Sequence, residues 1–331
     1  MRNAPSFSTK ALHYILMPFS VLSPTSKGYL AGLTAIVLWS VNVIIARIYA
    51  GHMGAAEITM WRWLVAVCIL VPFAMKPVRA AWPIMKARPV FYLSLLVGLG
   101  IFRIVLLNSL VYLAGETASA IDMALMGTTG PLFLALLGSI FLKKSISLRQ
   151  ILGYGITISG VVLLILHGDL TNLQDFHFVA GDAWMLVSAL CFAIYSIILE
   201  FKPKDFSATA LLTLSAIIGL ALVTPLGIQD ILDRGTLPPT STLLVMVYLG
   251  IFPSVVAFYC WLAALKYLGP VRSGLIYYML PLLSSLEAVA FLGESFAVSQ
   301  AFGAVLILGG VMFASHARHT KTHAVHGVHS L

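Results

Sequence analysis

Ten stretches of this chain are each long and apolar enough to cross a lipid bilayer as an α-helix. A spanning helix needs roughly 20 mostly apolar residues. Only 10% of the 331 residues are charged, against about 25% in an average soluble domain. We therefore predict an all-α, polytopic membrane protein whose apolar surface faces lipid. The predicted helices are residues 28–49, 57–76, 90–113, 117–142, 148–166, 180–200, 207–227, 242–265, 270–292 and 297–315.

Basic residues are distributed unevenly between the two sets of loops. The side that holds the N-terminus carries most of the lysines and arginines, whereas the opposite side keeps only Arg47 and Arg234 near its surface. Short loops rich in Lys and Arg stay in the cytoplasm during insertion, so we predict ten spans with both termini cytoplasmic. This asymmetry also accounts for the net charge of +8 without a nucleic-acid partner. The basic side comprises Arg2, Lys10, Lys27, Lys76, Arg79, Lys86, Arg88, Lys143, Lys144, Arg149, Lys202, Lys204, Lys266, Arg272, Arg318 and Lys321.

The second half of the chain repeats the first. The tetrapeptide LGIF at 99–102 recurs at 249–252, and the same 150-residue spacing pairs Pro131 with Pro281 and Gln150 with Gln300. Each half has five predicted helices, an odd number, so the second half must enter the membrane from the opposite face. Inverted repeats of this kind occur in many secondary transporters, which bind substrate near the bilayer midplane between the halves.

Several motifs resemble paired EamA domains of the drug/metabolite transporter superfamily. They are LWSVN at 38–42, WRW at 61–63, the two repeat-related prolines, and ALKYLGPVRSGLIYYMLPLLSSLEAVAFLGES at 264–295. The resemblance covers residues 28–315 and is closest to bacterial exporters of amino acids and metabolites. It implies two inverted five-helix EamA repeats in a bacterial inner membrane, and a secondary transporter that exports amino acids or similar small metabolites by alternating access.

The resemblance and the loops together divide the chain into five parts. Residues 1–26 are expected to form a cytoplasmic N-terminal extension, and 316–331 a disordered, histidine-containing cytoplasmic tail, with metal binding by the tail as the alternative. The two EamA repeats are expected at 27–166 and 180–315, joined by an extracytoplasmic linker at 167–179.

Ionisable residues inside spans are costly and therefore mark candidate sites. Arg103 lies near the middle of the helix 90–113, and Asp122 and Glu287 lie at similar depths in two other helices. We interpret Arg103 as a ligand for a substrate carboxylate, with an acid available for an amine or a proton. The alternative is a buried ion pair between Arg103 and either acid. Arg62, nearer a helix end, is expected to reach the headgroups.

Polar and aromatic residues within spans extend the candidate site. Asn42 lies near the midplane, where its amide faces either a cavity or a neighbouring helix, and Asn108 is expected to serve packing. Aromatic rings could stack on a solute and orient it through their polar tips, although ordinary helix packing is the default for each. Trp61, Trp63 and Trp184, near helix ends, are expected to be interfacial anchors. The candidate aromatic site residues are Trp39, Tyr195, Tyr259, Tyr277 and Tyr278.

Prolines and glycines recur at equivalent places in both halves. Pro131 and Pro281 interrupt two spanning helices and are interpreted as hinges, the alternative being fixed kinks. Small residues allow close helix approach, and such glycines lie in the fifth and tenth helices of the chain. We expect them to serve helix packing, with a homodimer seam as the alternative, in a monomer or weak homodimer. They are Gly153, Gly160, Gly303 and Gly310.

Other functional classes find less support in the residues. No histidine lies inside a predicted span and no acidic cluster appears, so an intramembrane enzyme is the less favoured alternative. The sequence contains no phosphate-binding loop for ATP, and nothing in it resembles the selectivity filter of a channel. We expect a small-molecule substrate, no cofactor or metal, and no disulfide among Cys68, Cys191 and Cys260.

Overall fold

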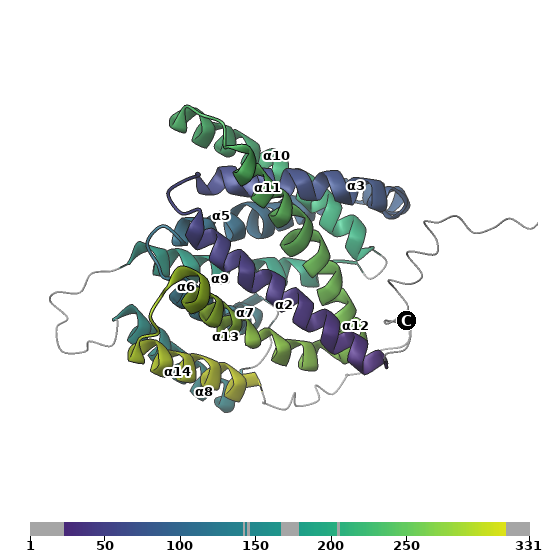
Figure 1. Cartoon of the computed structure of the whole chain (residues 1–331). Helices are drawn as coiled ribbons and strands as arrows, with labels where there is room; N and C mark the ends of the chain where they lie inside the picture. Colours follow the sequence, from purple (N-terminus) through teal and green to yellow (C-terminus); the bar gives the residue numbers. More distant parts are fainter. Residues whose placement is uncertain (1–22, 142, 144–145, 167–178, 204–205, 316–331) are drawn as a thin grey trace, which may run out of the picture.

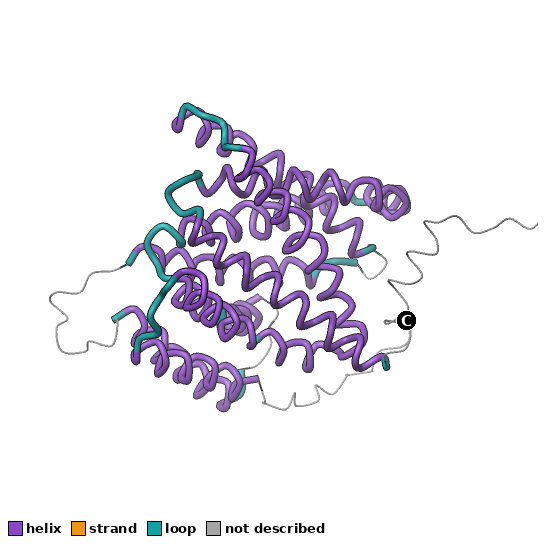
Figure 2. Tube along the Cα trace, viewed as in Figure 1, coloured by secondary structure: helices purple, strands orange, loops and turns teal. Residues whose placement is uncertain are grey.

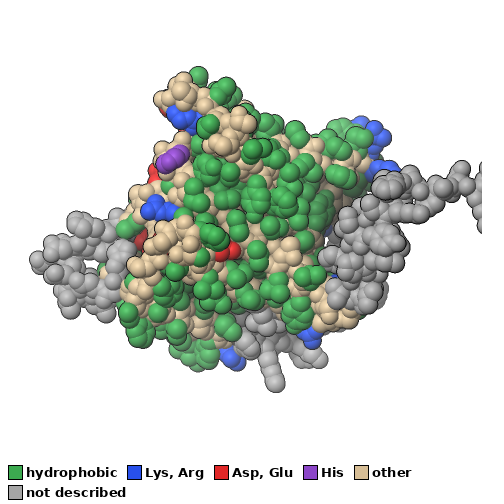
Figure 3. Space-filling view, in the orientation of Figure 1, with side chains coloured by type: hydrophobic (Ala, Val, Ile, Leu, Met, Phe, Trp, Pro, Cys, Tyr) green, Lys and Arg blue, Asp and Glu red, His purple; other side chains and the backbone are tan. Residues whose placement is uncertain are grey.

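The structure is a computed structural model that describes residues 23–141, 143, 146–166, 179–203 and 206–315. The predicted linker at 167–179, except for its last residue, the tail at 316–331 and most of the N-terminal extension lie outside these ranges. All regular structure in the described ranges is helical (Figures 1 and 2). Apolar side chains cover most of the face shown in Figure 3, as expected of a surface in contact with lipid.

The first half runs from α2 to α8. Its elements are α2 (Pro24–Ile48), α3 (Ala55–Ala87), α4 (Pro89–Leu99), the π-helix η1 (Gly100–Leu106), α5 (Leu107–Ala114), α6 (Ala120–Gly127), α7 (Gly130–Phe141) and α8 (Leu148–Ile165). The second half comprises α9 (Ala180–Glu200), α10 (Ala208–Arg234), α11 (Thr240–Leu249), the π-helix η3 (Gly250–Val256), α12 (Ala257–Tyr277), α13 (Met279–Glu287), the π-helix η4 (Ala288–Leu292) and α14 (Val298–Ser315).

Nine helical stretches of the described chain are long and apolar enough to cross a membrane. They match nine predicted spans, and the tenth apolar stretch, Val298–Ala314, is a shorter helix. The largest difference is α3, which continues past the predicted end at residue 76 to Ala87. Its 33 residues span about 50 Å at 1.5 Å per residue, so its last turns extend beyond a hydrocarbon layer of roughly 30 Å. A left-handed glycine, Gly269 with φ 76°, separates the eighth and ninth stretches.

Helix contacts in one half have counterparts in the other. The helix α2 packs on α12 and α13, while its repeat partner α9 packs on α5 and α7. Likewise, α3 contacts η3 and α10 contacts η1. Two helices pack directly against their repeat counterparts, α3 against α10 and α8 against α14. These two pairs lie at opposite edges of the bundle in Figure 1. The two halves therefore pack against each other with approximate two-fold symmetry.

Irregular backbone also occurs at equivalent places. The π-helices η1 and η3 begin 150 residues apart, at Gly100 and Gly250. In η3, Pro253 has no N–H group and cannot continue the α-helical ladder. In η1, the Asn108 side chain donates to the carbonyls of Arg103 at 2.8 Å and Ile104 at 3.2 Å. Asn108 therefore stabilises the irregular turn, a more specific role than the helix packing predicted for it.

The two prolines predicted to interrupt helices follow such breaks. The helix α6 ends at the cap residue Thr128, three residues before Pro131, and α12 ends at the cap residue Tyr278, three residues before Pro281. The predicted interruptions are thus present at matching positions. Whether they act as hinges stays a prediction.

Candidate functional site

An aromatic cluster lies where α2 meets the second half of the chain. The rings of Trp39, Trp261 and Tyr277 are mutually in contact, with centroids separated by 5.6 to 6.3 Å. The Trp39 indole donates a hydrogen bond of 3.0 Å to the carbonyl of Pro253 in η3. The π-helix therefore provides the backbone acceptor that orients this ring. Trp261 was absent from the predicted site, because nothing in its local sequence distinguishes it from other apolar residues.

Arg103 projects from η1 toward the ring of Tyr195 on α9. Its guanidinium carbon lies 5.4 Å from the ring centroid, a cation–π geometry. Its Nε is buried without a hydrogen-bond acceptor. The ion pairs formed between described residues do not include Arg103, so the alternative of a pair with Asp122 or Glu287 is not what the structure shows.

Arg62 is buried, and the expectation that it reaches the headgroups was wrong. Only 5% of the residue is exposed. Its Nε donates to the Ser254 hydroxyl at 2.6 Å, and its Nη1 donates to the Asn42 amide oxygen and the Tyr112 hydroxyl at 2.9 Å each. The Tyr112 hydroxyl in turn donates to the Asn42 oxygen at 3.0 Å. Trp63, 2% exposed, is also not the interfacial anchor that was predicted, because α3 turns both residues into the bundle.

Glu287 lies between the end of α13 and α2. One carboxylate oxygen, Oε1, accepts a hydrogen bond of 2.8 Å from Ser40, and the other, Oε2, is buried without a partner. The Tyr248 hydroxyl of α11 lies close enough to interact electrostatically with this carboxylate. A buried carboxylate with one unused oxygen can accept a proton or a donor from a ligand.

Asp122 belongs to a separate polar cluster at the start of α6. Its carboxylate accepts from Ser119 at 2.6 Å and from Gln300 of α14 at 3.0 Å. Asp182 of α9, 2% exposed and with an unpaired Oδ1, lies close enough for the two carboxylates to interact electrostatically. Asp182 was not among the predicted site residues, because its sequence position is that of an ordinary acidic residue in the first turn of a helix.

Glu294 links several elements near this polar cluster. Its carboxylate accepts from the backbone N–H groups of Ala120 and Ile121 at 2.9 and 3.3 Å, at the positive N-terminus of α6. Arg47 donates a hydrogen bond of 2.7 Å from Nη1 to the Gly115 carbonyl, and its Nε lies 3.9 Å from Oε1 of Glu294. These contacts join α2, α6 and the segment after η4.

The remaining predicted tyrosines are dispersed. Tyr259 is exposed on α12, and its hydroxyl lies 3.4 Å from that of Thr209. Tyr278 is half-buried at the break before α13. The structure therefore brings Trp39 together with Tyr277, and Arg103 together with Tyr195, but places Tyr259 apart from both groups.

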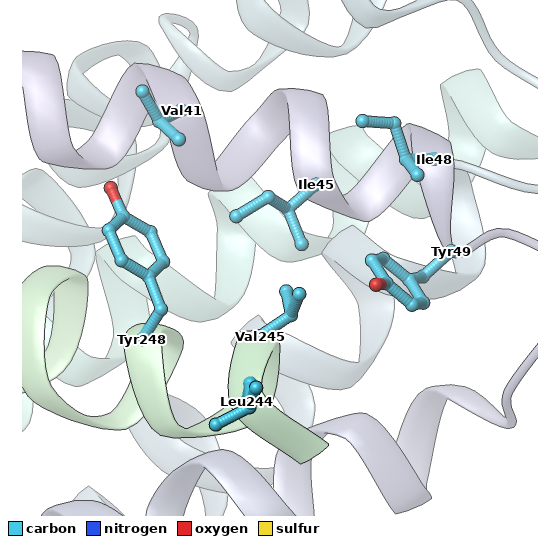
Figure 4. A pocket seen from close by; sticks show the side chains of 7 residues that line it. All are labelled: Val41, Ile45, Ile48, Tyr49, Leu244, Val245 and Tyr248. Atoms are coloured by element: carbon cyan, nitrogen blue, oxygen red, sulfur yellow. The ribbon is translucent and has the colours of Figure 1, made fainter. Parts of the chain in front are cut away.

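An apolar groove opens between α2 and α11 (Figure 4). It has a volume of about 570 Å³ and contains none of the polar or charged residues predicted for the site. Its walls suit a hydrocarbon chain rather than a polar solute, so we place the candidate site at the interior polar groups instead. The lining residues are Val41, Ile45, Ile48, Tyr49, Leu244, Val245 and Tyr248.

Comparison with known proteins agrees with this architecture. The model of the EamA-like transporter family matches residues 26–166 and again 179–316. An uncharacterized transporter of Bacillus subtilis, YyaM, is 24% identical over 279 residues, which cover 82% of this chain and 88% of that protein. A probable terminal-alkyne amino-acid exporter of Streptantibioticus cattleyicolor is 24% identical over 287 residues, covering 87% of this chain and 93% of the exporter. A solved crystal structure superposes with a TM-score of 0.57 at 22% identity, covering 87% of this chain and 96% of the other.

Proposed function

The chain belongs to the EamA-like transporter family, and we propose that it is a secondary transporter that exports amino acids or similar small metabolites. The observation that carries this proposal is the matched pair of interlocked halves, each with a π-helix and a broken helix at the same repeat position. Two equivalent halves around one interior site can open alternately to either side of a membrane. The relatives named as transporters support the class.

We further propose ten spanning helices with both termini in the cytoplasm of a bacterial cell and the protein in the inner membrane. The shorter apolar stretch Val298–Ala314 of α14 packs along α8 and is treated as the tenth span. The EamA repeats then occupy 27–166 and 180–315, with a linker at 167–179 and terminal segments at 1–26 and 316–331. The uneven distribution of basic residues supports this orientation.

The proposed site lies between the halves, at the aromatic cluster and the charged groups around it. Trp39, Tyr277 and Tyr195 provide rings for the solute, and Arg103 makes this interior positive. Arg103 is also close enough to Tyr277 to interact with it electrostatically, which supports one continuous site. The breaks before Pro131 and Pro281 serve as hinges. The other residues proposed to line the path are Asn42, Asp122, Tyr259, Tyr278 and Glu287.

An amino acid or similar small metabolite fits this chemistry. Aromatic rings can hold an apolar side chain, and the arginines and Glu287 can hold opposite charges. One relative is named for the export of an amino acid, which supports the substrate class without identifying the substrate. The relatives are named as transporters rather than enzymes, and this supports transport as the activity.

Transport by the purified protein in liposomes tests the proposal. Liposomes loaded with one unlabelled L-amino acid at a time should take up the labelled form faster than empty liposomes, with saturable kinetics. Arg103→Ala should slow this exchange, and Arg79→Ala, at an exposed position of α3, should not. Flux that rises linearly with concentration and ignores the internal load would indicate a channel, and formation of a product without flux would indicate an enzyme.

A further inference from the structure

The guanidinium of Arg62 is held by uncharged groups from three other elements. Arg62 is on α3, and its acceptors Asn42, Tyr112 and Ser254 are on α2, α5 and η3. Ser254 itself is fixed, because its hydroxyl donates to the carbonyl of Leu249 at 2.8 Å. A long, flexible side chain is thus positioned with little remaining freedom. Such preorganisation lowers the cost of binding a ligand.

The positive charge of Arg62 has no negative partner in the described part of the chain. The nearest acid along α3, Glu57, is engaged by two hydrogen bonds from Arg234. On α2, Ser40 binds Glu287, and Arg47 lies beside Glu294. A buried charge with neutral partners alone is expensive inside a membrane protein. A neutral residue could join the same helices at lower cost, so the retained charge points to an anion that completes the site.

Two donors beside this charge are unused. Arg62 donates hydrogen bonds through Nε and Nη1, whereas its Nη2 has no acceptor among the described residues. The amide oxygen of Asn42 must face Arg62, since a guanidinium can only donate. The amide nitrogen Nδ2 of Asn42 is therefore directed elsewhere, and no described residue accepts from it. Asn42 is only half-buried, so part of its surface is accessible to a ligand.

The aromatic cluster adjoins the same donors. Trp39 and Asn42 are about one turn apart on α2, and the carbonyl that accepts from Trp39 belongs to Pro253, the residue before Ser254. A solute with an anionic head at Arg62 would thus place its remaining atoms near apolar rings. Planar carboxylates match the fork of donors that a guanidinium presents.

We propose that Arg62 and Asn42 form the binding site for the carboxylate group of the transported solute. This inference rests on the proposed transport function and specifies its substrate class as carboxylic acids, including amino acids. It assigns the carboxylate contact, which was predicted for Arg103, to Arg62 instead. Arg103 then contributes the positive potential near Tyr195 and Tyr277. Solutes that differ only by replacement of the carboxylate with an uncharged amide should be rejected.

The test measures binding and transport of the full-length protein with defined probes. Each of the twenty standard L-amino acids is compared with its own carboxamide, both for the shift in melting temperature of the detergent-purified protein and for uptake into liposomes. At least one acid should stabilise the protein and be transported, and its carboxamide should bind about tenfold or more weakly, as expected for loss of charge-assisted hydrogen bonds. Equal binding of acid and carboxamide would overturn the carboxylate assignment.

The variant Asn42→Asp distinguishes a ligand-binding role of Arg62 from a purely structural role in joining helices. The variant places a carboxylate against Arg62, so it should fold with an unchanged or higher melting temperature without ligand. It should nevertheless lose the stabilisation and uptake of acids, because the guanidinium is occupied and the new charge repels the solute. Arg62→Gln should lose the same acid response, and exposed Arg79→Gln should keep it.

Three outcomes are decisive. If Asn42→Asp binds and transports acids as the native protein does, Arg62 only links helices and the inference is wrong. If the native protein transports amino acids and their carboxamides alike, the proposed transport function is supported and the proposed carboxylate site is wrong. If no acid or carboxamide is bound or transported by the native protein, the proposed transport of amino acids is itself overturned.

Discussion

The contact between α8 and α14 depends on two glycines that face each other. A Cβ atom added to Gly153 would lie 2.6 Å from the carbonyl oxygen of Gly310, and one added to Gly310 would lie 2.5 Å from the oxygen of Gly153. Gly155 and Gly309 lie on the same two helices, but a Cβ atom there meets nothing within 4 Å. These four positions allow an alanine substitution to be compared with a matched control on each helix.

The expected effect follows from these distances. Ordinary van der Waals contact begins at 3.4 Å, so the helices must separate by roughly 0.8 Å in Gly153→Ala, and an overpacked contact of this kind costs about 1–3 kcal/mol. In the controls Gly155→Ala and Gly309→Ala, loss of glycine's backbone freedom should stabilise the helix by about 0.5–1 kcal/mol. Gly310→Ala should resemble Gly153→Ala.

The free energy of unfolding in mixed detergent micelles, measured by titration with a denaturing detergent, checks this prediction. The two facing-glycine variants should be less stable than the native protein, and the two controls equal to it or more stable. The double variant of Gly153 and Gly310 should cost less than the sum of the single variants, because one separation relieves both contacts. Equal stability of all four single variants would refute the close approach of α8 and α14.

Three further predictions concern other parts of the molecule. Arg234→Gln removes the partner of Glu57, whose side chain is fully buried. The free energy of unfolding should fall by about 3 kcal/mol, the lower end of the range for a broken buried pair. No change in denaturant titrations would show that the pair contributes nothing to stability. If Glu287 carries a coupling proton, Glu287→Gln should flatten the pH profile of transport in liposomes, and an unchanged profile would exclude it. In a cysteine-free background, an impermeant thiol reagent applied to whole cells should label a cysteine at exposed Gly51 and not one at exposed Arg88; the reverse pattern would mean the opposite orientation.

Hydropathy and charge predicted the helices well because the bilayer imposes one requirement on every span. Nine of the described helical stretches coincide with predicted spans, and the breaks near residues 128 and 278 follow from the repeat-related prolines. The extension of α3 to Ala87 was not predicted, because its last turns are too polar to count as membrane-spanning. The equivalent π-helices were also unforeseen, because only the folded structure shows that Asn108 donates to carbonyls of η1 and that Pro253 lies within η3.

The candidate site was predicted less completely because hydropathy determines depth in the membrane but not the direction a side chain faces. Arg62 was placed near the headgroups from its distance to the helix end, whereas the rotation of α3 turns it inward toward Ser254, 192 residues away in sequence. Trp261 likewise could be recognised only from its contact with Trp39. Residues such as these gain their roles from partners that only the folded chain brings together.

Exchange across a membrane is the most direct test of a carrier built from two equivalent halves. Purified protein in liposomes should catalyse saturable uptake of a labelled L-amino acid that is accelerated by the same unlabelled amino acid inside, because a single site returns faster when it is occupied. Uptake that does not saturate and is unaffected by the internal amino acid, or no uptake of any of the twenty, would contradict an amino-acid carrier.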